Sequence, residues 1–314
     1  MIKVEFAIIV AKQVLIMFFL ISLGIIVCRK NILSLEATRG LSDFILIIVS
    51  PCLLISSFQR QIDSNEVKGL ILAFILSFIF NAMAVVISNL LIRKREDSNY
   101  RVERMGGVYS NCGFMAFPLL AMVLGDVGVF YGAVYVTVFN IFLWSSGVIT
   151  LTSYSEINKL KILFNPGTIA TFIGLVLYFT QIHVPEVLSQ TITYVANLNT
   201  PLSMIMIGVF LARVDVKETI SDIRIYFVSI IRLIVLPIIL LLLVKITGVV
   251  GLFDGAKTAT IAITICSACP AAVSVILMVS KMKLNDTYGA RILALSTLLS
   301  LITLPLITLL AISI

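Results

Sequence analysis

Long apolar runs separated by short clusters of charged residues make up most of this 314-residue chain, of which 60% is hydrophobic and 12% charged. Soluble domains carry about 25% charged residues, so the composition excludes that class. A membrane-spanning helix needs about 20 apolar residues. On that criterion ten spans are predicted, at about 6–28, 38–58, 69–92, 105–123, 127–152, 164–182, 187–211, 224–246, 257–280 and 286–312. We therefore predict an all-α integral membrane protein.

Basic residues are distributed unevenly between alternate loops of these predicted spans. Of the 23 lysines and arginines, 15 follow odd-numbered spans and six lie on the opposite side, while Arg232 and Arg291 fall within spans. Cytoplasmic loops are enriched in basic residues, so the pattern predicts that both termini lie outside the cytoplasm. The predicted location is the plasma membrane. The net charge of +7 follows from this topology, and no nucleic-acid partner is predicted.

Two pairs of prolines recur at nearly the same spacing in the two halves of the chain. Pro51 and Pro201 are 150 residues apart, and Pro118 and Pro270 are 152 residues apart. This agreement predicts a duplicated unit of five spans, with one unit at 1–155 and the other at 156–314. Because five is an odd number, the second unit has the opposite orientation in the membrane. Inverted repeats favour a transporter over a channel or a membrane enzyme.

Small, polar and proline residues interrupt the fourth and ninth predicted spans, at 111–118 and 267–270. Proline lacks an N–H, and unpaired backbone groups are tolerated at membrane depth only inside protein or beside a wet cavity. Paired interruptions in two halves predict the binding site of a secondary transporter. The starts of broken helices carry partial positive charge, which suits a carboxylate. The predicted substrate-binding residues are Asn111, Cys112, Gly113, Phe114, Pro118, Ser267, Ala268, Cys269, Pro270 and Arg232.

Several of these residues also have a structural interpretation. Asn111 can bind substrate or cap a neighbouring helix, and Gly113 can be an ordinary glycine of a membrane helix. Arg232 can bind a substrate carboxylate, or its long side chain can reach the membrane interface. Cys266 and Cys269 are interpreted as small packing residues rather than a redox or metal pair, so no cofactor is predicted. A coupling ion, proton or sodium, stays open.

Four motifs together resemble the auxin efflux carrier family, in its bacterial branch of organic-anion permeases. They are Ser-Pro-Cys-Leu-Leu at 50–54, Ser-Asn-Cys-Gly-Phe-Met-Ala-Phe-Pro at 110–118, Arg-Leu-Ile-Val-Leu-Pro at 232–237 and Ser-Thr-Leu-Leu-Ser-Leu-Ile-Thr-Leu-Pro at 296–305. The likeness runs over essentially the whole chain. The chain differs from many plant members by its short connection between spans five and six and by Asn-Cys-Gly in place of Asn-Pro. Both differences fit the bacterial branch.

The resemblance implies a ten-helix fold with crossed broken helices, similar to bile-acid symporters and sodium/proton antiporters. Spans 1, 2, 6 and 7 would form a scaffold and the surface of a homodimer. The other spans would move across the bilayer as an elevator that carries substrate. The implied substrates are small organic anions, including dicarboxylates such as malate or malonate.

Three other functions compete with this one. An auxin-like carrier would export an aromatic carboxylate, and a sensor would keep the fold without transport. The intact interruptions in both halves argue against the sensor. An intramembrane aspartyl enzyme needs a pair of facing carboxylates, whereas Asp43 and Asp286 come without a matching motif.

Overall fold

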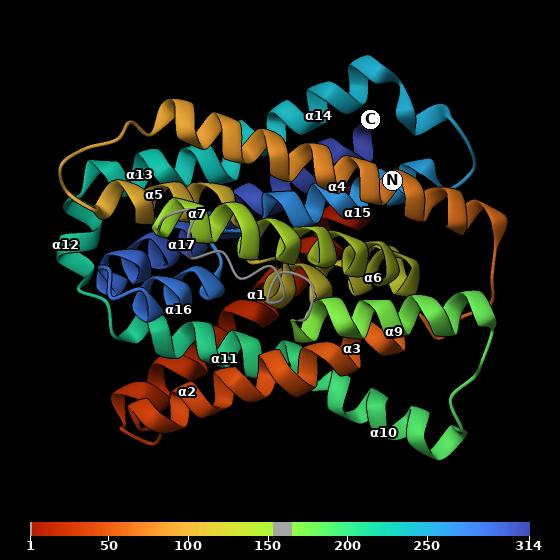
Figure 1. Cartoon of the computed structure of the whole chain (residues 1–314), viewed down its shortest axis with the longest axis horizontal. Helices are drawn as coiled ribbons and strands as arrows, with labels where there is room; N and C mark the ends of the chain where they lie inside the picture. Colours follow the sequence, from red (N-terminus) through yellow and green to blue (C-terminus); the bar gives the residue numbers. More distant parts are fainter. Residues whose placement is uncertain (1, 153–164) are drawn as a thin grey trace.

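The computed structural model consists of helices that run between two ends of the molecule (Figure 1). It describes the backbone of residues 2–152 and 165–314, and their side chains except those of residues 2–11, 14, 35 and 39. Lys159, Lys161 and the predicted boundary between units at 155/156 therefore lie outside the described residues, as do the side chains of Lys3 and Arg39.

The helices of the first half follow the predicted ranges closely. They are α1 (Ile2–Arg29), α2 (Leu35–Phe44), η1 (Ile45–Val49), α3 (Ser50–Ser57), α4 (Ser64–Leu91), α5 (Asn99–Val108), η2 (Cys112–Ala116), α6 (Phe117–Phe142), η3 (Leu143–Gly147) and α7 (Val148–Leu151). Within α6, Gly125 has φ +65° and ψ −155°, so the helix is broken there into two. Glycine adopts this positive φ without the steric cost of a Cβ. The break coincides with the short loop predicted between spans four and five.

The second half has the same kind of helices. They are α9 (Pro166–Thr180), α10 (Glu186–Asn197), α11 (Asn199–Ala212), α12 (Val216–Ser221), α13 (Ile223–Ile230), η5 (Ile231–Val235), α14 (Leu236–Thr247), η6 (Val249–Gly251), α15 (Ala256–Ala268), α16 (Val273–Lys281) and α17 (Asp286–Ser313). The helix α15 ends at Ala268 and α16 begins at Val273, which places an interruption in the predicted ninth span.

Six helical stretches within the described residues are long and apolar enough to cross a membrane. They are Glu36–Ser57, Ser64–Leu91, Cys112–Leu151, Glu186–Ala212, Ile223–Thr247 and Asp286–Ser313. Shorter apolar helices are Leu15–Arg29, Pro166–Thr180 and Ala256–Ala268. The prediction of an all-helical, multi-pass membrane protein is confirmed in this coarser form. The count of ten spans and the inverted repeat stay predictions.

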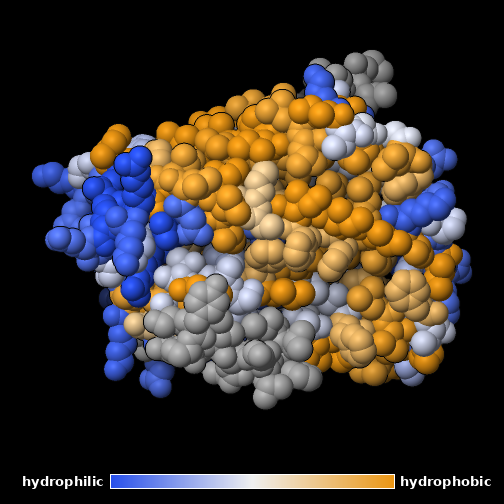
Figure 2. Space-filling model, turned by 45° about the horizontal axis from the view of Figure 1, so that its top comes forward, coloured by the Kyte–Doolittle hydropathy of each residue, from blue (hydrophilic) through white to orange (hydrophobic). Residues whose placement is uncertain are grey.

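Polar and apolar residues are separated along the long axis of the molecule. Figure 2 shows a broad hydrophobic band over the middle and a dense group of hydrophilic residues at one end. We call this the basic end; it is formed by the loops 92–98, 213–215 and 282–285. The loops 58–63, 181–185 and 252–255 form the opposite end, and both chain termini lie toward that side of Figure 1.

Three π-helical turns each precede a proline within a longer helix. η1 lies before Pro51, η2 before Pro118 and η5 before Pro237. The ring of a proline clashes with the carbonyl four residues earlier, and in each case that carbonyl belongs to the π-helical turn. The wider π-helical turn accommodates this clash, so these helices continue through their prolines.

Helices from opposite halves of the chain pack tightly against each other. A Cβ on Gly24 of α1 would lie 2.0 Å from the carbonyl oxygen of Ile205 in α11, and one on Gly208 would lie 2.0 Å from the carbonyl oxygen of Ile21. In the same way, Gly174 of α9 packs directly on the ring of Phe58, which follows α3. Small residues let membrane helices approach this closely.

Candidate functional site

The two interrupted helices meet at their interruptions. The chain between α5 and η2 is extended and pairs in antiparallel fashion with the chain between α15 and α16, through a bridge of Ser110 with Ala271. The amide of Asn111 donates a hydrogen bond of 2.7 Å to the carbonyl of Pro270, and the amide of Ala272 donates one of 2.9 Å to the carbonyl of Tyr109. The backbone groups released by each interruption are thus satisfied by the other, as burial requires.

The first interruption does not lie where its proline predicts. The helix α5 ends at Val108 and η2 begins at Cys112, whereas Pro118 occupies the first turn of α6. The prediction that Pro118 breaks the helix is therefore wrong. The helix that begins at Cys112 continues through Pro118, because the π-helical turn η2 accommodates the clash of the proline ring with the carbonyl four residues earlier. The bridge matches Ser110 of the first interruption with Ala271 of the second.

Arg232 lies behind the paired interruptions and is completely buried. Its Nε donates to the carbonyl of Cys269 at 3.2 Å, and its Nη1 donates to the carbonyl of Val108 at 2.7 Å. Its Nη2 donates to the carbonyl of Ser267, and the guanidinium stacks 5.4 Å from the ring centroid of Phe80. The carbonyls belong to the C-terminal ends of α5 and α15, where the helix dipoles are negative. Arg232 therefore neutralises the two helix ends that face it.

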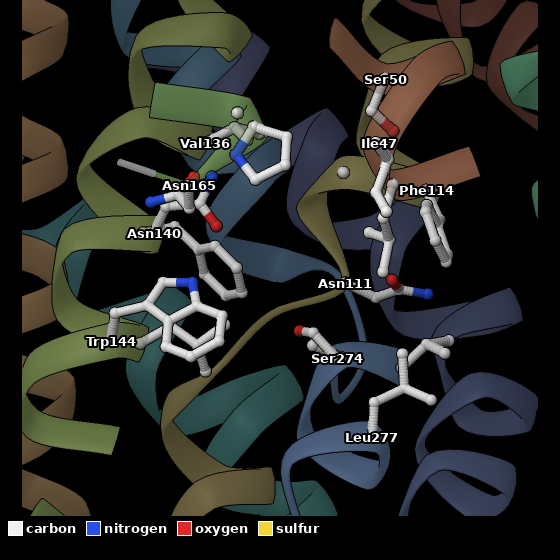
Figure 3. A pocket seen from close by; sticks show the side chains of 18 of the residues that line it. Ile47, Ser50, Asn111, Phe114, Val136, Asn140, Trp144, Asn165, Ser274 and Leu277 are labelled. Atoms are coloured by element: carbon white, nitrogen blue, oxygen red, sulfur yellow. The ribbon is translucent and has the colours of Figure 1, made fainter. Parts of the chain in front are cut away.

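A cavity of about 340 Å³ lies on the other side of the paired interruptions. Its lining combines residues from both interruptions with residues of α2, η1, α3, α6, η3, α9 and α16. In Figure 3, Asn111 and Ser274 lie across the cavity from Asn140, Asn165 and Trp144. The lining reaches the basic end of the molecule at two exposed charged residues, Asp43 and Lys281.

Asn111 is the buried polar residue that the cavity leaves unsatisfied. The residue is 4% exposed, and its Nδ2 has no hydrogen-bond partner among the described residues. The helices that start at Cys112 and Val273 begin beside it, and the first N–H groups of a helix have no partner within the helix. Residues of both helix starts, among them Gly113 and Val273, therefore line the cavity together with Asn111, and the described lining holds no acid except Asp43 at its mouth.

The structure brings only some of the predicted site residues to this cavity. Asn111, Gly113 and Phe114 line it. Cys112, Pro118, Ser267, Ala268, Cys269, Pro270 and Arg232 are buried and do not belong to its lining. In the second half the lining residues are Ala272, Val273 and Ser274, directly after the interruption. Cys112 and Cys269, both predicted to bind substrate, are fully buried in this structure.

Comparison with known proteins assigns the chain to a family. The profile of the family described as "Membrane transport protein" matches residues 9–160 and 150–308. The chain belongs to this family. It is the auxin efflux carrier family, so the resemblance of the four motifs is confirmed.

Two relatives that cover most of this transport-family protein carry transporter names. It is 24% identical over 303 residues to an "Uncharacterized transporter" of Methanothermobacter thermautotrophicus, covering 94% of this chain and 96% of that one. It is 25% identical over 254 residues to a "Putative malonate transporter" of Rhizobium meliloti, covering 75% and 76% of the two chains. A shorter match, 33% over 57 residues, is to "Protein ECM3" of Saccharomyces cerevisiae and covers 18% of this chain and 9% of that one. Family and relatives point to a transporter rather than an enzyme.

Sequence reasoning missed several residues of the transporter's cavity. Asn140, Asn165 and Ser274 contribute polar groups to the lining. Asn140 could have been noticed, since it is an amide inside the apolar run Val-Thr-Val-Phe-Asn-Ile-Phe. Asn165 caps α9 and accepts a hydrogen bond of 2.9 Å from the amide of Thr168. In the sequence it looks like an ordinary residue at a helix start, so nothing marked it as part of a cavity.

Arg291, predicted within a span, has a structural partner instead. It forms an ion pair with Glu218 of α12, near the basic end. The length of the arginine side chain lets its guanidinium reach this polar end from α17. Although Arg291 lies in a predicted span, its charge is therefore paired near the basic end.

An ion pair and a group of aromatic rings lie beyond the cavity residue Leu54, toward the opposite end of the molecule. Arg60 and Glu66 are 2.6 Å apart, and the guanidinium of Arg60 lies 5.4 Å from the ring centroid of Phe130. Phe130 packs at 5.1 Å on both Phe58 and Tyr178. Phe58 follows Leu54, a cavity-lining residue, by about one helical turn. We call Phe58, Arg60, Glu66, Phe130 and Tyr178 the outer seal.

Proposed function

We propose that this protein is a secondary transporter that moves small organic anions, with mono- or dicarboxylates such as malate or malonate as substrates. The observation that carries the proposal is the convergence of two helix starts and the unpaired amide of Asn111 on one cavity wall. Helix starts attract carboxylates through their free N–H groups and dipoles. A carboxylate at membrane depth needs such compensation, because an uncompensated charge there costs several kcal/mol.

Arg232 compensates the negative ends of the broken helices and leaves their positive ends to act on the substrate. In a pair of broken helices the C-terminal ends carry partial negative charge and would oppose an anion. Here the carbonyls of Val108, Ser267 and Cys269 are bonded by Arg232 on the side away from the cavity. The positive helix starts are left to face the cavity. We therefore propose that Arg232 shapes the anion site without touching the substrate, which replaces our expectation of direct contact.

Lys281 supports a dicarboxylate in particular. Lys281 is the last residue of α16, whose first residue is Val273. At a rise of 1.5 Å per residue, the two are about 12 Å apart along the helix. Its flexible ammonium can extend toward a second carboxylate while the first is held at the helix start. Asp43 at the same mouth weakens the field of Lys281 and favours release over tight retention.

An aromatic monocarboxylate is the second candidate substrate, because of the rings in the lining. Phe114, Phe117, Phe139 and Trp144 all border the cavity, and aromatic side chains pack favourably on an aromatic ligand. This observation supports the auxin-like alternative. The two candidates differ in charge and in apolar surface, so one substrate panel separates them.

Alternating access is supported by the shape of the cavity. It extends toward the basic end, which the distribution of basic residues assigns to the cytoplasm, and the outer seal lies toward the opposite end. We propose that the structure represents an inward-facing state in which both termini lie outside the cytoplasm. The homodimer is proposed on the resemblance alone.

The inverted repeat is supported by matched packing. Gly24 and Gly174 are 150 residues apart, as are Phe58 and Gly208. Gly24 packs against Gly208, and Gly174 packs against Phe58. A shift of 150 residues turns Gly24 into position 174 and Gly208 into position 58, so it converts the first contact into the second. The same offset separates Pro51 from Pro201. This is the relation expected of two duplicated units at 1–155 and 156–314.

Transport in reconstituted vesicles tests the proposal. Purified protein in proteoliposomes would be supplied with radiolabelled malonate, malate and an indole carboxylate, with and without imposed proton or sodium gradients. We expect saturable uptake of at least one carboxylate above protein-free vesicles, and no uptake of a neutral sugar. Absence of uptake of every anion under all gradients, with protein shown to be folded, would contradict the proposal.

A further inference from the structure

A second hollow lies at the basic end of the molecule and shares no residue with the cavity. It is an open groove of about 410 Å³ between the end of α4 and the start of α13. It is lined by Leu91, Ile92, Arg93, Arg95, Glu103, Ile223, Arg224 and Phe227. The lining therefore combines guanidinium groups, which we call the basic side of the groove, with the exposed apolar side chains of Leu91, Ile223 and Phe227, which we call its apolar side.

The charges in the groove are only partly compensated within the protein. Arg95 is engaged with Glu103 at 2.6 Å, and Glu103 also accepts a hydrogen bond of 3.0 Å from the hydroxyl of Tyr288. Arg224 is 4.0 Å from Glu103 and half exposed. Arg93 is exposed, and within the described part of the chain it has no hydrogen-bond or ion-pair partner. Two guanidinium groups thus remain for an anion from outside.

The backbone beneath these arginines is held in place. Arg104 donates to the carbonyls of Ile92 at 2.9 Å and Asn89 at 3.2 Å, which satisfies carbonyls at the end of α4. The ion pair of Arg95 with Glu103 fixes the following loop to α5. Arg93 lies between these two anchors, so the groove is formed before any ligand arrives.

The apolar side of the groove continues into the hydrophobic surface. Ile223 is 77% exposed, and Leu91 and Phe227 are close to half exposed. Leu91 is the last residue of α4, directly before the loop 92–98 of the basic end, and Ile223 is the first residue of α13. Free phosphate would use the arginines alone. A phospholipid would use both sides, since its phosphate and its acyl chains are joined in one molecule. Basic pockets between membrane helices on the cytoplasmic side bind anionic headgroups.

We propose that this groove binds an anionic phospholipid, with its phosphate between Arg93 and Arg224 and an acyl chain against Ile223 and Phe227. The proposed membrane orientation assigns that lipid to the cytoplasmic leaflet. The site itself does not depend on the transported substrate.

Native mass spectrometry of the full-length protein in detergent tests the proposal without any transport measurement. The protein would be incubated with equal amounts of phosphatidylglycerol and phosphatidylcholine that have the same acyl chains. We expect preferential retention of phosphatidylglycerol. The double variant Arg93→Gln/Arg224→Gln should weaken this binding about tenfold to thirtyfold, because each arginine near an anionic lipid contributes about 1 kcal/mol. The matched control Lys94→Gln/Lys217→Gln removes the same charge at the same end but outside the groove, and should bind as the parent does.

Two outcomes would overturn the proposal. One is equal phosphatidylglycerol binding by the parent and the double variant. The other is displacement of the lipid by glycerol phosphate or inorganic phosphate at concentrations similar to that of the lipid, which would show that the groove recognises a free anion. If the double variant does not fold, Arg93→Gln decides instead, since that side chain makes no hydrogen bond or ion pair within the described protein and its loss should still weaken binding several-fold. Transport activity enters neither comparison, so failure here is distinct from failure of the proposed function.

Discussion

The amide of Asn111 donates a 2.7 Å hydrogen bond to the carbonyl of Pro270, which joins the interruption of one half of the chain to that of the other. The return bond from Ala272 to Tyr109 makes the connection bidentate. Neither interruption can move alone without leaving buried backbone groups unpaired, which costs about 1–3 kcal/mol for each group. The two broken helices are therefore expected to move as one body.

Asn111 is expected to contact the transported anion. Replacing it by Ala removes one side-chain donor but keeps the backbone amide that bonds to Pro270. Affinity for the carboxylate should fall about tenfold, as expected for loss of a hydrogen bond to a charged group. The Michaelis constant in proteoliposomes measures this, with Asn197→Ala, an exposed position on α10, as control. An unchanged constant would remove Asn111 from the substrate site.

Arg232→Gln should act through stability. The variant leaves the carbonyls of Val108, Ser267 and Cys269 without their charged donor in a buried place. A loss of about 3 kcal/mol or more is expected, and Arg232→Lys should restore little, since an ammonium cannot reproduce the planar set of donors. Thermal unfolding in detergent measures the effect. If Arg232→Gln melts like the parent but selectively loses dicarboxylate transport, the arginine contacts substrate after all.

Cysteine labelling should distinguish the two faces of the paired interruptions. Ser274→Cys places a thiol in the cavity lining, whereas Cys112, Cys266 and Cys269 are fully buried. A small charged thiol reagent should modify position 274, and saturating substrate should slow the reaction. Peptide mapping after labelling reports each site separately in the same sample. Rapid modification of Cys112 or Cys269, with position 274 protected, would reverse the assignment of the cavity side.

Opening of the outer seal should be favoured by Glu66→Gln. The change removes the charge that pairs with Arg60. Outward opening is expected to break this ion pair. Weakening the pair by about 1–2 kcal/mol would therefore raise the population of the outward-open state about fivefold to thirtyfold. The labelling rate of Leu54→Cys by a membrane-impermeant reagent from outside measures the open population. Glu186→Gln, an exposed acid at the same end, is the control and should leave the rate unchanged.

A reporter fused after Ile314 tests the membrane orientation. An enzyme that is active only in the cytoplasm should remain inactive there, whereas the same enzyme inserted in the loop 92–98 should be active. These outcomes follow from the excess of basic residues in that loop and its neighbours. Cytoplasmic activity at the C-terminus would reject both the orientation and the inward-facing assignment of the cavity.

The positions of the helices were predictable because the bilayer requires long apolar runs, and these are visible in a linear sequence. Asn111 was predictable for a related reason, since an amide beside glycine inside such a run has no place in an ordinary span. Pro118 misled the prediction because a π-helical turn lets a helix continue through a proline, and the sequence does not reveal that the interruption lies at residues 109–111 instead. Asn140 and Ser274 were missed because which face of a helix borders a cavity depends on its neighbours.

The sequence by itself determined the membrane class, the helical ranges, the family and the two interruptions, because each of these depends on local composition or on a contiguous motif. Only the tertiary structure decided how the interruptions pair, where the cavity lies and what Arg232 does. Arg232 makes its hydrogen bonds to carbonyls of Val108, Ser267 and Cys269, which come from two other helices. Such contacts join residues far apart in the chain, and their partners are chosen by packing and by the need to satisfy every buried backbone group.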